Sequence, residues 1–511
     1  MGLCDSKGYR AKRLEAAGGL AVLLASLWWF VFLSQRRLIA GDEGFYLMAS
    51  KLTLEGKTPY LDFFYPQMPL LPYIYGLFMK AFGVGWGEGR FFSALLSSVL
   101  CLLIFYRCRS ASSLIGGFFG AFLFAFSAMV FPWFVTVKTY PLSVFFLFVS
   151  YLLMCSAKKG AVWSLLAGVS LGCSVSTRLF FCVLVPLFGW YIFTKKGRRG
   201  FWWFVLGNAL ALVPATVLAL KDWESFWFCN LGYHLIRSDI GFWDSLRSKG
   251  TIAKIIFGIR GTRKFCGIHF AVLLVLSFGY FLYSRLKKIE IDPSFLIMLF
   301  LLIVSFLPVP SYVQYFSVLS PFAVICTVLI LRDLWRGKGK IAVVLIVLVL
   351  GYEYSVSLIS DVERYTKTGE GVIGIRGREE AKNKTLASLR EISRAVDGVL
   401  RGGETVISIW PGYIVSSKKA KPYPGTENHF ALKSAHKVNK DRWRRFHLIS
   451  YEAVGSAIRE RKVRVVVMSA KAYERRYRED LKYGGYLKES EVRGVYIFVK
   501  DGQKSDGKGS F

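Results

Sequence analysis

Long apolar runs dominate the first 360 residues of the chain. Several exceed the roughly 18 residues that an α-helix needs to cross a bilayer, for example "FWWFVLGNALALVPATVLAL" at Phe201 to Leu220. The pattern predicts about eleven membrane-spanning helices, near residues 17–33, 91–106, 111–131, 141–157, 161–176, 179–193, 201–220, 267–284, 294–307, 316–331 and 341–358. The fold class predicted for this part is therefore a polytopic α-helical membrane protein.

The pattern changes after about Asp361, where polar residues become frequent. Apolar positions in "TLASLREISRAVDGVL" recur every three or four residues, which predicts a helix, whereas "ETVISIW", "VRVVVMSA" and "GVYIFVK" predict short buried strands. Helices at about 450–462 and 471–482 separate the later strands. We therefore expect two domains, a membrane domain at 1–360 and a small α/β domain at 361–511 with a parallel or mixed sheet.

Charge gives the orientation of the spans. The chain has 67 Lys and Arg against 34 Asp and Glu, a net charge of +33. Basic clusters recur between apolar runs, at Lys7 to Arg13, Arg107 and Arg109, Lys158 and Lys159, Lys195 to Arg199, Arg285 to Lys288, and Arg332 to Lys340. The positive-inside rule places these clusters and the N-terminus in the cytoplasm, and the alternation of spans places the C-terminal domain outside. Topology thus explains much of the charge, and nucleic acid is a poor candidate for a partner.

The charge of the C-terminal domain and the positions of the cysteines and histidines are less informative about function. The C-terminal domain is also basic, which fits contact with anionic lipid head groups, contact with an acidic acceptor, or simply a solvated basic surface. None of the nine cysteines forms a CxxC pair and the five histidines lack metal-ligand spacing, so no disulfide framework and no zinc site are expected. No small-residue cleavage site follows the first apolar run, which we therefore interpret as a retained span.

The stretch "LIAGDEGFY" places two acids, Asp42 and Glu43, directly after the first span. One interpretation is structural, because an acid at a helix start caps free N–H groups and meets the positive end of the helix dipole. The other is chemical: a carboxylate at the hydrocarbon edge can serve as a general base or bind a cation. The position outside the membrane favours the chemical role, and the two roles are compatible.

The same outer loop, at about 34–90, continues with "GKTPYLDFFYPQMPLLPYIYG". Three prolines at three-residue spacing predict a stiff, partly extended segment, and tyrosines suit a membrane interface. The segment is either an interfacial anchor or one wall of a polar, aromatic cleft for a lipid-attached group. The residues that would line such a cleft are Tyr60, Asp62, Tyr65 and Gln67, together with Tyr312, Gln314 and Tyr315 of a later outer loop.

Four basic residues lie on the same side of the membrane as the acid pair: Lys138, Arg178, His234 and Arg237. A cation at the end of a span usually extends its side chain to the interface without further function. Several cations on one side are, however, also suited to bind a phosphate or pyrophosphate.

Five segments of the sequence resemble the GT-C membrane glycosyltransferases: "GDEGFY", "TPYLDFFYPQMPLLPYIYG", "VKTYPLSVFF", "GYHLIRS" and "VQYFSVLSPF". The chain is most similar to family 39 of these enzymes, the protein mannosyltransferase-like and aminoarabinose transferase-like proteins of prokaryotes. The resemblance covers about residues 12–355, and the acid pair is its most specific element. The C-terminal domain is similar only in position and general class.

The resemblance implies transfer of a hexose or pentose from a polyprenyl (dolichyl or undecaprenyl) phosphate to an acceptor on the outer side of the membrane, usually with inversion. It makes Asp42 the general base or acceptor-orienting carboxylate, with Glu43 beside it and Asp62 as a second candidate acid. It makes the four outer cations candidates for binding the donor phosphate. The acceptor would be a lipid, a glycan or a protein of the cell envelope, with membrane lipids as further partners.

No cofactor is expected. Some GT-C enzymes use a divalent metal held by several carboxylates, but the outer loops contain few acids, so metal-independent transfer is the better expectation. Two other classes of function remain open: a transporter or lipid flippase, which would tend to show charged sites within the spans and repeated halves, and a non-catalytic membrane assembly subunit. The spans are nearly free of charge and no halves match, which disfavours the transporter.

Overall fold

The computed structural model describes residues 2–156, 160–259, 267–375 and 377–500. Of the predicted basic clusters, Lys158 and Lys159 lie outside the described residues. The helices of the first part are α1 (Gly2–Arg36), α2 (Glu43–Leu54), α3 (Leu70–Phe82), α4 (Trp86–Ala111), α5 (Leu114–Ala125), α6 (Phe131–Phe134), α7 (Thr139–Cys155), α8 (Ala161–Thr177), α9 (Leu184–Lys221), α10 (Trp223–Trp227), α11 (Tyr233–Ile236), α12 (Phe242–Ile256), α13 (Gly267–Leu286), α14 (Pro293–Ser305), α15 (Ser320–Arg336) and α16 (Lys340–Glu363).

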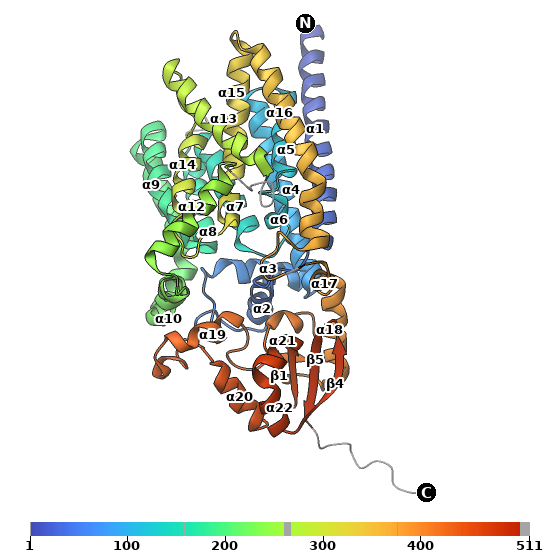
Figure 1. Ribbon diagram of the computed structural model, residues 1–511. Helices are drawn as coiled ribbons and strands as arrows, with labels where there is room; N and C mark the ends of the chain where they lie inside the picture. The colour runs from blue at the N-terminus through green and yellow to red at the C-terminus, as the bar shows by residue number, and fades with distance from the viewer. Residues whose placement is uncertain (1, 157–159, 260–266, 376, 501–511) are drawn as a thin grey trace.

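These helices form an elongated bundle, and a smaller domain with a β-sheet lies at the end opposite the N-terminus (Figure 1). The turn between α15 and α16, which carries the predicted cluster Arg332 to Lys340, lies at the same end as the N-terminus. The helices α2 and α3 lie between the bundle and the small domain.

Six helices in the described part of the chain are long and apolar enough to cross a bilayer: Lys12–Arg36, Trp86–Ala111, Leu179–Lys221, Ile268–Leu286, Val313–Arg336 and Lys340–Thr368. Five shorter apolar helices are Leu70–Phe82, Leu114–Ala125, Thr139–Cys155, Ala161–Thr177 and Pro293–Ser305. The predicted spans 179–193 and 201–220 are joined as one element, kinked at Gly197, where φ is 75°. The total of eleven spans stays a prediction, but a helical membrane protein is confirmed.

Several of these helices expose large apolar side chains, as a bilayer protein requires. On α16, Ile341, Leu345 and Leu348 are all exposed, and Leu220 at the end of α9 is 82% exposed. A contiguous apolar surface of this kind is unfavourable in water and is stabilised by hydrocarbon.

The first outer loop is more helical than its prolines suggest. The segment is irregular up to Met68, but Pro69 then caps α3, and Pro72 lies in the first turn of that helix. The predicted stiff, extended segment is therefore wrong beyond Pro69. The physical reason is that the first turn of a helix has no use for the N–H group that proline lacks.

The C-terminal domain confirms the predicted α/β class. Its helices are α17 (Arg378–Lys382), α18 (Leu386–Val399), α19 (His429–Ser434), α20 (Tyr451–Arg459), α21 (Ala470–Ala472) and α22 (Arg478–Tyr483). Its strands are β1 (Glu404–Ser408), β2 (Ala420–Pro422), β3 (Val465–Ser469), β4 (Tyr486–Val492) and β5 (Val495–Lys500). The sheet is mixed, in the order β2-β1-β3-β5-β4, with β2, β1 and β3 parallel and the last two pairings antiparallel.

The domain is tied closely to the first outer loop. Trp410 Nε1 donates to the carbonyl of Gly41 over 2.8 Å, and Trp86 Nε1 donates to Gly412 over 3.1 Å. A Cβ added at Gly44 would lie 3.0 Å from the backbone of Gly412, so the glycine allows α2 to approach this closely. The C-terminal domain thus fixes the position of the "GDEG" segment.

Candidate active site

Asp42 lies at the position directly before α2. Its carboxylate accepts no capping hydrogen bond from the helix. Instead, Lys138 Nζ donates to Asp42 Oδ2 over 3.3 Å, although Lys138 is 96 residues away in the sequence. The Asp42 side chain is 40% exposed and that of Lys138 only 5%. Asp42 thus holds the N-cap position of α2 without making the expected capping hydrogen bond, and its carboxylate remains accessible beside a buried ammonium group.

Glu43 has entirely different surroundings from its neighbour. Its side chain and that of Arg90 are both fully buried, and Arg90 donates to Glu43 Oε1 over 2.7 Å and to Oε2 over 2.8 Å. The backbone N–H groups of Ala40 and Val137 also donate to this carboxylate, over 3.0 and 3.3 Å. All its accepting positions are occupied by protein groups, so Glu43 holds the loop in place and has no free oxygen for a substrate.

The predicted cations converge on two adjacent residues of the 3₁₀ segment η4 (Val313–Leu319). Lys138 Nζ donates to Gln314 Oε1 over 3.2 Å. Arg178 stacks over the Tyr315 ring at 5.1 Å, and Arg237 donates to the Tyr315 hydroxyl over 3.3 Å. Three positive side chains from separate helices are thereby brought together near Asp42, as the sequence predicts for a phosphate site.

The electrostatics of Asp42 follow from this arrangement. Burial alone would raise the pKa of Asp42, but the Lys138 ammonium and the hydrogen bond that it donates lower the pKa further than burial raises it. The net pKa lies below the ordinary value, so the carboxylate is ionised at neutral pH. A base with a lowered pKa is weak, and it strengthens when the neighbouring cation moves to another anion.

His234 and Asp62 do not join this group. His234 Nε2 lies 3.1 Å from the carbonyl of Pro66, and burial lowers the pKa of His234 to about 3, so the ring is neutral. Asp62 is exposed and accepts from the backbone N–H of Thr58 over 2.7 Å within its own turn. A neutral imidazole is a poor phosphate ligand, and Asp62 is fully explained by its turn.

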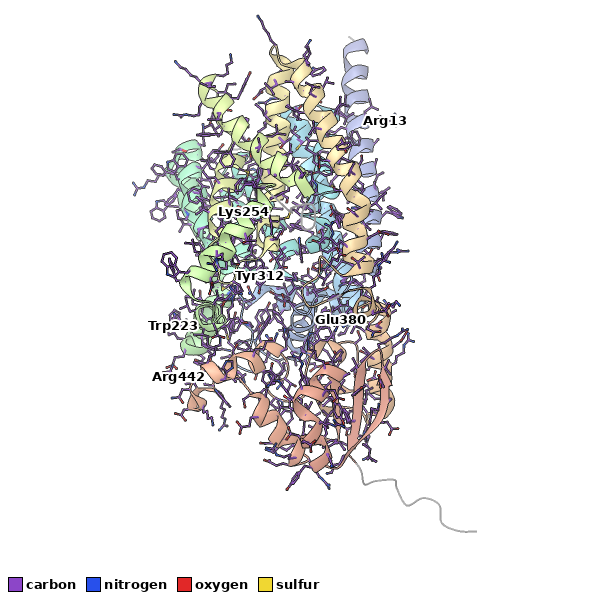
Figure 2. The ribbon with its side chains drawn as sticks, viewed as in Figure 1. Arg13, Trp223, Lys254, Tyr312, Glu380 and Arg442 are labelled. Atoms are coloured by element: carbon purple, nitrogen blue, oxygen red, sulfur yellow. The ribbon has the colours of Figure 1, made fainter. Side chains whose placement is uncertain are left out.

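Only part of the predicted aromatic lining lies near Asp42 and the cations. Tyr60 and Tyr65 are buried, and Tyr60 donates its hydroxyl to the carbonyl of Gln67 over 2.5 Å. These side chains form the core of the outer loop. Tyr312 stacks edge-on against Tyr315 at 5.6 Å and lies between the bundle and the C-terminal domain, beside the converging cations (Figure 2).

Several residues of the site escaped sequence reasoning. Arg90 and Trp410 position the loop, while from α19 of the C-terminal domain Lys433 acts electrostatically on Asp42 and His429 packs beside α2. Burial lowers the pKa of His429 to about 3, and its ring packs 6.1 Å from Phe45 of α2. Arg90 lies in "GEGRFF" at the start of a span, where an unpaired arginine is energetically costly. This cost is the feature of the sequence that predicts an acidic partner for Arg90.

The side chains around Asp42 that could bind a ligand are three cations and the amide of Gln314. In the described ranges, no group of three or more His, Cys, Asp or Glu side chains lies close enough together to hold a metal ion. Lys138, Arg178 and Arg237 supply the positive charge that an anionic ligand needs at this site.

Comparison with known proteins shows similarity to one family model and to several solved structures. The family model described as dolichyl-phosphate-mannose-protein mannosyltransferase matches residues 66–220. No curated protein sequence matches the chain. The structure of ArnT from Cupriavidus metallidurans bound to undecaprenyl phosphate is similar at a TM-score of 0.64, with 12% identity, over 94% of this chain and 97% of that one.

A second solved structure, the apo oligosaccharyltransferase of Archaeoglobus fulgidus, is similar at a TM-score of 0.51, with 12% identity, over 96% of this chain and 75% of that one. At such identities the likeness shows the fold. This chain therefore shares its fold with ArnT over almost its whole length, the C-terminal domain included.

Proposed function

Because the chain has the GT-C fold of membrane glycosyltransferases, we propose that it transfers a hexose or pentose from a polyprenyl phosphate to an acceptor at the outer face of the membrane. The N-terminus and the basic turns lie in the cytoplasm, and the C-terminal domain lies outside. The observation that carries the proposal is the accessible Asp42 carboxylate beside three converging cations.

The cations suit a donor phosphate. Polyprenyl phosphate leaves as an anion when the bond between the sugar C1 and the phosphate oxygen breaks, so positive charge at that oxygen lowers the barrier. Lys138 and Arg237 offer N–H donors, and Arg178 adds a guanidinium in a fixed orientation between aromatic rings. Such charges are more effective at a partly buried site than in water.

Asp42 acts as the general base in this mechanism. The acceptor hydroxyl loses its proton to Asp42 as its oxygen attacks C1 from the face opposite the phosphate, which inverts the configuration. The electron pair of the broken bond leaves with polyprenyl phosphate. When the donor phosphate binds Lys138, the ammonium neutralises Asp42 less, so donor binding raises the basicity of the carboxylate.

The remaining charged residues support this centre. Glu43 and Arg90 hold the loop that carries Asp42, and Trp410 fixes the same loop from the C-terminal domain. We propose metal-independent transfer, in which Lys138, Arg178 and Arg237 supply the charge that a divalent ion supplies elsewhere. Full activity in the presence of a chelator tests this point, and its loss, restored by a divalent cation, would contradict it.

The decisive experiment compares lipid-linked sugars and surface glycans by mass analysis in three strains: wild type, a deletion strain, and the deletion strain carrying Asp42→Asn. We expect the deletion and Asp42→Asn strains to accumulate the same sugar-phosphate lipid and to lack the same surface modification. The accumulating lipid identifies the donor. Normal glycans in the Asp42→Asn strain would remove Asp42 from the mechanism.

Two further experiments, on purified protein and on a chain that lacks the C-terminal domain, separate the alternative functions. A flippase or transporter would leave purified protein unable to transfer sugar while moving its substrate across proteoliposomes. A non-catalytic assembly subunit would lose partner binding on deletion of the C-terminal domain, and the strain would accumulate no donor.

A further inference from the structure

The C-terminal domain carries a basic segment, residues 437–447, beside the outer end of α9. Two of its cations are neutralised by the membrane domain. Lys437 pairs with Asp239 at 2.5 Å, and Arg445 pairs with Asp222 at 2.9 Å and Glu224 at 3.0 Å. These pairs hold the segment against α10 and α11.

The other three cations of the basic segment are free. Lys440, Arg442 and Arg444 are exposed, and among the described residues their side chains have no hydrogen-bond or ion-pair partner. They lie close together in sequence with one acid, Asp441. Unneutralised charges on a segment whose backbone is anchored in this way are suited to an anionic partner.

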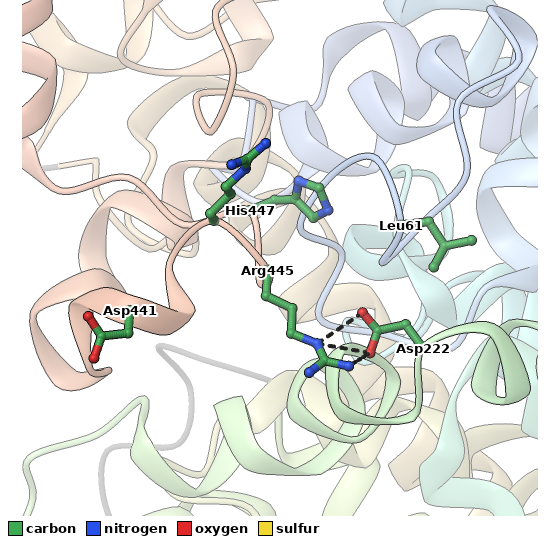
Figure 3. Close-up of a pocket in the computed structure, with 6 residues that line it drawn as sticks. Leu61, Asp222, Asp441, Arg445 and His447 are labelled. Carbon is green, nitrogen blue, oxygen red and sulfur yellow. Dashed lines mark hydrogen bonds and ion pairs between the residues drawn. The ribbon is translucent and has the colours of Figure 1, made fainter.

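A pocket of about 430 Å³ opens at this segment, where the outer loop, the end of α9 and the C-terminal domain meet. Leu61, Asp222, Asp441, Arg444, Arg445 and His447 line it. Figure 3 shows Arg445 turned toward Asp222, with His447 and Asp441 on the C-terminal side of the same space. With Arg445 engaged, Arg444 is the arginine of the pocket that remains available to a ligand.

The surroundings place this pocket at the level of lipid head groups. Trp223 is 62% exposed and Leu220 82% exposed at the outer end of α9, and Trp227 is also exposed. Tryptophan concentrates where hydrocarbon meets water, so these residues mark the membrane edge. Arg442 lies on the far side of Trp223 from the bundle, on the water side of that edge (Figure 2).

We propose that this pocket binds the head group of an anionic lipid of the outer leaflet. Arg444, which lines the pocket, and Arg442, two residues earlier in the same exposed segment, contact the phosphate, Asp441 accepts from a head-group hydroxyl, and the acyl chains lie against Leu220 and Trp223. Leu220 and Trp223 are exposed on either side of Asp222, a residue of the pocket lining, and such apolar neighbours favour a lipid over a soluble phosphate compound. This inference goes beyond the proposed sugar transfer and does not depend on it.

The test measures binding of phosphatidylglycerol and phosphatidylcholine to the purified full-length protein by native mass spectrometry. We expect phosphatidylglycerol to bind more tightly, and the double variant Arg442→Gln/Arg444→Gln to weaken it about 30-fold, from about fivefold for each arginine near a charged surface. The matched control removes two exposed cations that lie outside the basic segment and the pocket lining, as Lys471→Gln/Arg475→Gln, and should leave binding unchanged.

Three outcomes would overturn the proposal: equal binding of the two lipids, an equal loss in the Lys471→Gln/Arg475→Gln control, or complete displacement of phosphatidylglycerol by inorganic phosphate. Since Arg442 and Arg444 have no partners to lose, both double variants should unfold at the wild-type temperature. This check separates a binding defect from a folding defect.

Discussion

Asp42 and Glu43 are neighbours in the chain, yet they belong to two different regions of the molecule. Asp42 faces an open space with one buried ammonium at 3.3 Å, whereas Glu43 faces inward and is held by Arg90 at 2.7 Å with no exposed surface. A carboxylate whose oxygens are all occupied stabilises a structure, and one with a free, solvent-accessible oxygen can react. The difference is set by residues far away in sequence, and it can be tested by changing each region separately.

The largest effect is expected from Asp42→Asn. The amide keeps the shape of the carboxylate but takes no proton, so sugar transfer should fall by about 10²–10⁴-fold, the usual contribution of a general base. Initial rates with the donor identified in the deletion strain measure this. The unfolding temperature should stay the same, since Asp42 has only one pair to lose, and a wild-type rate would exclude the base role.

Glu43→Gln should act mainly on stability. It leaves Arg90 buried with a lost charge partner, which destabilises by about 3–5 kcal/mol in comparable buried pairs. Thermal unfolding in detergent should show the loss together with reduced activity. The control Glu43→Gln/Arg90→Met removes both charges and should recover part of the stability. If Glu43→Gln unfolded like the wild type but lost all activity, Glu43 would belong with Asp42.

Lys138→Met should change both binding and pH dependence. We expect kcat/KM to fall about 10²-fold, as for loss of one transition-state donor. Lys138 lowers the pKa of Asp42, so its removal raises that pKa, and the activity that Asp42 supplies as a base is then lost at a higher pH on acidification. A profile of kcat/KM against pH measures the shift. Lys80→Met, at an exposed site on α3, is the control and should move neither quantity.

The smallest effect is expected from Asp62→Asn. This exposed side chain accepts one hydrogen bond from Thr58 in a turn, so stability should change by less than about 0.5 kcal/mol and the rate should stay at the wild-type level. A loss of activity on the scale of Asp42→Asn would show that Asp62 reaches the acceptor.

Much of the architecture was accessible from sequence because it depends on local pattern. The long apolar runs, the amphipathic repeat of 386–399 and the three buried strands each record a periodicity that the structure confirms. The fold that the resemblance to the GT-C glycosyltransferases implies is confirmed as well. The start of α3 was not predicted because proline is common both in extended segments and in the first turn of a helix.

Only part of the candidate site could be predicted from the sequence. The acid pair and the cations could be proposed from side and loop, but the assignment of roles depends on tertiary contacts. No local feature tells that Arg90 binds Glu43 rather than Asp42, or that Lys138 reaches Asp42 from the start of another helix. The sequence alone does not show that His429 packs against Phe45 of α2, because this contact depends on how the C-terminal domain docks on that helix.

The hydrogen bond from Trp410 to Gly41 also orders events during synthesis. Among the residues that the structure describes, Trp410 and Gly412 follow all the long apolar helices, so a nascent protein can insert its helical bundle before the residues that fix the "GDEG" segment have been made. Under the topology and the function proposed above, this geometry forms only after the C-terminal domain has been exported and folded. A chain truncated before Trp410 is then expected to insert into the bilayer without becoming active.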